Sequence, residues 1–97
     1  MYIDRNIKQM LTDWLGNETD RLVNQVKQTE RMKLLTDYLA SSIIRLNDDT
    51  DFTIFNVLDE LVRFNGNDDK TDKVYSNSLT DLIRRLINNL NYVWKKD

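Results

Sequence analysis

Residues 32–46, MKLLTDYLASSIIRL, form the stretch that decides the fold. Its apolar side chains occupy most of a helix circumference when they are plotted at about 100° per residue. A helix that is apolar on nearly every side needs neighbours on more than one side, so we expect residues 32–46 to be the central helix of a small bundle. The apolar residues are Met32, Leu34, Leu35, Tyr38, Leu39, Ala40, Ile43, Ile44 and Leu46.

The composition of the whole chain favours helices over sheets. The 97 residues include no Pro and only two Gly, and sheet proteins need many tight turns that lean on those two residue types. Asp and Asn, which prefer helix caps and connectors, far outnumber Glu, which prefers helix interiors. The sequence therefore predicts a single all-α domain over residues 1–97, a small bundle of about four mostly antiparallel helices.

A first helix is expected from Asp4, a good N-cap, to Leu15. Gly16 follows directly and is the natural residue to end that helix. Asn17 is expected to cap a second helix. The apolar stripe of the first helix consists of Ile3, Ile7, Met10, Leu11, Trp14 and Leu15.

The link between residues 22–26 and the central stretch leaves two alternatives open. At about 100° per residue, Leu22 and Val26 point well away from Leu35 and Leu39, so the two halves do not share a face. Either a new helix begins near Thr29, or one long helix changes packing partners halfway. The continuous helix is favoured slightly, because no Gly or Pro interrupts it.

Two further helices are expected downstream. The third ends at Asn65-Gly66, and the last begins between Thr71 and Ser78, where Ser78 and Asp81 resemble a capping box. A β-hairpin that pairs residues 61–64 with 73–75 is a weaker alternative, because the alternation is poor. The apolar residues of these helices are Ile54, Phe55, Val57, Leu58, Leu61, Val62 and Phe64, then Tyr75, Leu79, Leu82, Ile83, Leu86, Ile87, Leu90, Val93 and Trp94.

The residue types argue against catalysis and against bound metals or cofactors. His and Cys are absent, so the usual general base near neutral pH, the best nucleophile and thiolate metal ligands are all missing. The two glycines lie too far apart for a phosphate-binding loop. The acidic runs at residues 48–51 and 68–72 lack the spacing of a calcium-binding loop and are expected to be helix caps and solvated loops.

Charge and hydropathy bound the environment. No apolar run approaches the roughly 18 residues of a membrane span, and the N-terminus has no signal-peptide pattern. We therefore expect a soluble cytoplasmic protein without a membrane partner. The net charge of −2 argues weakly against nonspecific nucleic-acid binding, which needs a basic face.

A protein-binding role remains the favoured function. On the last helix, Arg85, Asn88 and Tyr92 share a polar face of residue types that are enriched at interfaces, and Asp68 and Asp69 form an acidic loop. We expect a non-enzymatic inhibitor or accessory factor that occludes a partner's surface, steered by its acidic loops. Richness in Asn, Asp, Lys and Ile suits a phage or mobile element of a low-GC bacterium. The long apolar stripes are also compatible with a homodimer.

Two alternative functions stay open. The first is a small DNA-binding transcriptional regulator, for which residues 24–33 form a polar helical run of types that contact bases and phosphates. That run consists of Asn24, Gln25, Lys27, Gln28, Arg31 and Lys33. The second rests on a resemblance, because small helical bacteriocin-immunity proteins are similar in size and helix count, which implies an immunity-like role.

Overall fold

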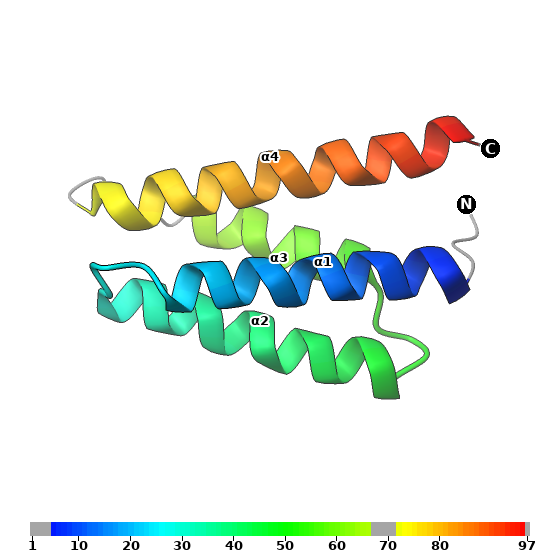
Figure 1. Ribbon diagram of the computed structural model, residues 1–97, viewed down its shortest axis with the longest axis horizontal. Helices are drawn as coiled ribbons and strands as arrows, with labels where there is room; N and C mark the ends of the chain where they lie inside the picture. The colour runs from blue at the N-terminus through cyan, green and yellow to red at the C-terminus, as the bar shows by residue number, and fades with distance from the viewer. Residues whose placement is uncertain (1–4, 67–71, 97) are drawn as a thin grey trace. The chain divides into compact units, whose positions relative to one another are not determined.

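The computed structural model describes residues 5–66 and 72–96, which form four helices joined by short connectors (Figure 1). They are α1 (Arg5–Val23), α2 (Glu30–Asp48), α3 (Ile54–Gly66) and α4 (Lys73–Lys96). No strand occurs in these residues, so the predicted all-α class with four helices is confirmed. The chain divides into two compact units, Met1–Val57 and Leu58–Asp97. The expected single domain stays a prediction.

In the first unit, α1 and α2 run antiparallel and lie side by side (Figure 1). Each helix buries one face, with apolar positions that recur every three or four residues along that face. The buried apolar residues of α1 are Leu11, Leu15 and Leu22, and those of α2 are Met32, Leu35, Leu39 and Leu46. The buried apolar residues that follow α2 in this unit are Phe52, Ile54 and Val57.

Helix α1 does not stop at Gly16, so the predicted helix end there is wrong. No glycine in the described residues has a positive φ, and Gly16 therefore lies in ordinary helical backbone. A glycine inside a helix costs about 1 kcal/mol relative to alanine. Continuing the helix buries Leu22 completely, and burying a leucine contributes roughly 1.5–3 kcal/mol. Burial outweighs the glycine penalty, and the predicted cap Asn17 lies inside α1.

The connector after α1 shows that the favoured continuous helix is wrong and that the break near Thr29 is correct. Gln28 Nε2 donates to the backbone oxygens of Leu22 (2.5 Å), Val23 (3.0 Å) and Gln25 (3.3 Å), so a side chain serves the carbonyl groups left at the end of α1. Thr29 Oγ1 then accepts from the backbone N–H of Met32 at 3.1 Å and caps α2.

Helix α2 is less enclosed than its sequence predicts. Leu34 and Ile44 are each 62% exposed, and Ala40 is exposed as well. The expected burial on several sides is therefore wrong, because one face of α2 is buried and the opposite face keeps apolar side chains at the surface. Other predicted apolar positions that prove exposed are Met10, Val26, Val62 and Ile87.

A short turn leads from α2 into α3. The guanidinium carbon of Arg45 lies 3.9 Å from the ring centroid of buried Phe52, a cation–π contact that holds the turn against the end of α2. Thr53 directly precedes α3, and its backbone N–H and its hydroxyl both donate to Asn56 Oδ1, at 2.7 and 3.0 Å. The Asn56 side chain thus accepts as the Glu of a capping box does, and this contact lies after the acidic run that was expected to supply the cap.

The second unit contains the rest of α3 and all of α4. Helix α3 ends at Gly66, as predicted, and Asp72 Oδ1 accepts from the backbone N–H of Tyr75 at 3.0 Å to cap α4. The helix start thus lies in the predicted range, but Ser78 is inside α4 and is not its cap. Residues 61–64 and 73–75 are helical, so the hairpin alternative is wrong. Buried positions are Leu61, Tyr75, Leu79, Leu82, Leu86, Leu90 and Val93.

Candidate functional site: an acidic groove between α1 and α2

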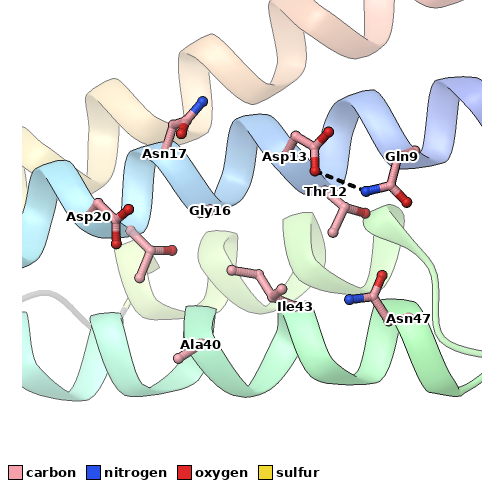
Figure 2. Close-up of a pocket in the computed structure, with 10 residues that line it drawn as sticks. Gln9, Thr12, Asp13, Gly16, Asn17, Asp20, Ala40, Ile43 and Asn47 are labelled. Atoms are coloured by element: carbon pink, nitrogen blue, oxygen red, sulfur yellow. Dashed lines mark hydrogen bonds between the residues drawn. The ribbon is translucent and has the colours of Figure 1, made fainter.

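A groove of about 550 Å³ runs between α1 and α2 (Figure 2). Its volume falls in the range of small-ligand and side-chain binding sites. One wall comes from α1 and the other from the antiparallel α2, so it lies wholly within the first unit. The lining residues are Gln9, Thr12, Asp13, Gly16, Asn17, Thr19 and Asp20 from α1, with Ala40, Ile43 and Asn47 from α2.

The middle of the groove is apolar because α1 presents its smallest residue there. Gly16 has no side chain, and a Cβ built on it would lie 4.0 Å from Ile43 Cδ1. Figure 2 shows Ile43 pointing toward Gly16, with Ala40 one turn away on α2. Small residues at facing positions thus leave a hollow between two helices that lie side by side.

The rim of the groove is acidic. Asp13 and Asp20 are both exposed, and neither Lys nor Arg is among the lining residues. Asp13 Oδ1 accepts from Gln9 Nε2 at 2.9 Å, which leaves its other oxygen open to solvent. The Asp20 carboxylate has no side-chain partner in the part of the chain that the structure describes. Two negative charges therefore stand along one wall without a cation from that groove to neutralise them.

The remaining polar groups divide into satisfied and available ones. The hydroxyl groups of Thr12 and Thr19 donate to the backbone oxygens of Lys8 and Leu15, both at 2.8 Å, so they are occupied within α1. Among residues 5–66 and 72–96, the side-chain amides of Asn17 and Asn47 make no hydrogen bond to protein. The groove thus offers carboxylate and amide groups on its rim to an incoming partner.

Two acidic residues stand at separate points along the α1 wall of the groove. Asp13 and Asp20 are seven residues apart on one helix, which places them roughly 10.5 Å apart along its axis. No group of three or more acidic residues in the described residues is arranged to hold a metal ion.

The predicted protein-binding residues lie elsewhere. Arg85, Asn88 and Tyr92 are exposed on α4, spaced so that they share one helix face, and Tyr92 is 57% exposed. Arg85 Nη1 lies 3.7 Å from Asp81 Oδ2, so an acidic neighbour offsets part of its charge. Asp68 and Asp69 lie outside the described residues. The structure therefore brings three of the five predicted residues to one face, and their role stays a prediction.

The residues predicted for nucleic-acid binding do not form one helical run, so that structural expectation is wrong. Asn24, Lys27 and Gln28 lie in the connector, while Arg31 and Lys33 lie in the first turns of α2. The reason is the change of buried face between the two helices, which a single straight helix could not satisfy. Gln28 is occupied by the end of α1. Whether these residues contact nucleic acid is untested.

The acidic turn after α2 makes local contacts, but it does not supply the expected cap of α3, which Thr53 and Asn56 provide instead. Asp49 Oδ1 accepts from the backbone N–H of Asp51 at 2.9 Å, and Asp49 Oδ2 lies 3.6 Å from Arg45 Nη2. Both contacts are local turn contacts of the kind that Asp makes beside a helix end.

Sequence reasoning missed the groove because it ended a helix at Gly16. With α1 continuous, Thr12, Gly16 and Thr19 recur at helical spacing as a line of small residues, and Asp13 and Asp20 follow a parallel line beside them. That pattern is visible in the sequence only when residues 5–23 are read as one helix.

The chain matches no protein-family model, and no curated protein or solved structure shows significant similarity to it. None of the described helices combines the length and the apolar character that crossing a membrane requires.

Proposed function

We propose that this chain is a non-enzymatic protein-binding module that occludes a basic surface of a partner protein through the groove between α1 and α2. The observation that carries the proposal is the groove's acidic rim, where Asp20 and the amides of Asn17 and Asn47 have no side-chain partner among the described residues and lie beside an apolar floor. Binding sites combine an apolar body with a few polar groups that fix orientation, and this groove has both.

The charge of the groove favours a basic protein surface over nucleic acid. Two carboxylates repel phosphate groups, whereas they attract Lys and Arg side chains and speed the encounter with a basic patch. The absence of His and Cys from the sequence supports a binding role rather than catalysis. The lack of Cys also suits action in a reducing compartment such as the cytoplasm.

The mode of action that fits a small groove-bearing helical chain is steric. A partner whose basic side chains sit in the groove has that patch covered by the rest of the chain, so the chain acts as an inhibitor or accessory factor. The Asn- and Asp-rich composition suits an origin in a phage or mobile element of a low-GC bacterium. The relevant partner is then a protein of that host.

A comparative pull-down tests the proposal. The wild-type chain, an Asp13→Asn/Asp20→Asn variant and an Asp48→Asn/Asp59→Asn control are each used on nuclease-treated lysate of a low-GC bacterium. Both variants remove two negative charges from exposed helix positions, so they have the same net charge. We expect one stoichiometric protein that the wild type and the control retain and the groove variant loses.

Two results would contradict this function. Equal recovery of the protein by all three chains would mean that the groove is not the contact. Loss of all partners on nuclease treatment, with DNA in the untreated eluate, would favour the DNA-binding regulator, whose binding should weaken steeply with salt.

A further inference from the structure

We infer that the groove between α1 and α2 receives one helix of the partner, and that this helix carries two cationic side chains seven residues apart. The inference rests on the proposed function, because it names the segment that the groove would bind. It follows from the spacing of the carboxylates, the shape of the floor and the helical character of both walls.

The carboxylate spacing matches a helical repeat. Asp13 and Asp20 are seven residues apart on α1, so they differ by only about 20° around the axis and by roughly 10.5 Å along it. Figure 2 shows them toward opposite ends of the groove. A second helix that lies along the groove has the same repeat, so Lys or Arg side chains at positions i and i+7 meet both carboxylates.

The apolar middle of the groove determines which side chains the partner helix carries between its two cationic residues. Gly16, Ala40 and Ile43 line the middle of the groove, between the ends marked by Asp13 and Asp20. A partner helix places positions i+3 and i+4 there, on the same face as i and i+7. Since this part of the groove is apolar, small or aliphatic side chains at those positions bury surface without leaving a polar group unpaired.

Both walls favour a helix over an extended peptide. An extended segment gains affinity by pairing its backbone with a free sheet edge. The described residues contain no strand, and α1 and α2 use their backbone groups within their own helices. A helix satisfies its own backbone groups and presents only side chains, which is the form of partner that this groove can accept.

Designed peptides test the inference directly. The probe is a stapled, alanine-based helix of about 18 residues, long enough to hold its helical form. It has two lysines seven positions apart and leucine between them on the same face. The control peptide has the same composition with its lysines five positions apart, on different faces. Binding to the full chain is followed by amide chemical shifts and fitted for Kd.

We expect the matched peptide to bind about fivefold more tightly than the control, because the control loses one of two exposed ion pairs. The largest shifts should fall on residues 9–20 and 40–47. Asp13→Asn and Asp20→Asn should each weaken the matched peptide by roughly two- to fivefold and remove its advantage over the control peptide. Asp59→Asn, an exposed acid on α3 that is not in the groove, should leave both affinities unchanged.

Each contrary outcome has a definite meaning. If both peptides bind the groove equally, the inferred helix with two cationic side chains is wrong. It is also wrong if neither peptide changes the amide chemical shifts of the groove residues. The pull-down then decides separately whether the groove binds a protein at all. If Asp59→Asn weakens binding as much as Asp13→Asn does, the attraction is one of net charge and the assigned register is wrong.

Discussion

Replacing Gly16 by alanine tests whether α1 runs through this position. The backbone of Gly16 is helical without a positive φ, so an L side chain fits it without strain. The nearest atom to an added Cβ would be Ile43 Cδ1 at 4.0 Å, an ordinary van der Waals contact. No steric cost therefore offsets the helix preference of alanine, which is about 1 kcal/mol over glycine.

We expect Gly16→Ala to raise the free energy of unfolding by about 1 kcal/mol. For a chain of this size, that change raises the thermal midpoint by roughly 4–8 °C. Urea unfolding, followed by far-UV circular dichroism and by tryptophan fluorescence, gives the free energy directly. Coincident transitions from the two probes establish that a two-state treatment applies.

The sign of the effect decides between two structures. If Gly16 ended a helix in the left-handed conformation, as the sequence alone predicts, alanine would lower stability by about 1 kcal/mol or more. A loss of stability in Gly16→Ala would thus refute a continuous α1. The matched control is Ala40→Gly, at an exposed position inside α2, which should cost roughly 0.5–1 kcal/mol.

Three other substitutions test the contacts that shape the first unit, each measured by the same urea unfolding. Thr29→Ala removes the cap that accepts from Met32 N–H and should cost about 1 kcal/mol, whereas Thr29→Asp should restore the cap; equal losses would argue against it. Gln28→Ala removes the side-chain donor to the carbonyl groups at the end of α1 and should lower the free energy of unfolding by roughly 1–2 kcal/mol. An unchanged free energy of unfolding would mean that water replaces the side chain as donor. Arg21→Ala should lower the free energy of unfolding by about 1–2 kcal/mol, because Arg21 Nε donates to the buried Glu18 carboxylate at 2.6 Å. An unchanged free energy of unfolding would mean that other groups around Glu18 compensate for the lost hydrogen bond.

A pattern of apolar residues alone does not identify every buried position, because the charged residue Glu18 is buried too. It is only 4% exposed, on the same buried face of α1 as Leu11, Leu15 and Leu22. Its burial is compatible with the fold because Arg21, one turn later, supplies a charged hydrogen bond.

The sequence by itself determined the helical class and most buried positions. The expected count of four helices is also correct, although the first two were divided at Gly16 instead of in the connector before Glu30. The lack of Pro and the 3.6-residue spacing of leucines are local properties, and no tertiary contact was needed to interpret them. The same spacing predicted the buried stripe of α4, where Leu79, Leu82, Leu86 and Leu90 are buried as expected. The change of buried face between residues 22–26 and 35–43 also pointed correctly to a break, although it was outweighed by the absence of Gly and Pro.

Only the tertiary structure decided where α1 ends and, with it, where the groove lies. Gly16 is a helix-ending signal worth about 1 kcal/mol, and the burial of Leu22 one and a half turns later exceeds it. The true end depends on the side chain of Gln28, which has no standard sequence signature as a cap. The groove requires α2 to lie beside a continuous α1, so that Gly16, Asp13 and Asp20 meet Ala40 and Ile43. Local preferences cannot specify that pairing, because it depends on contacts between residues that are 20 or more positions apart.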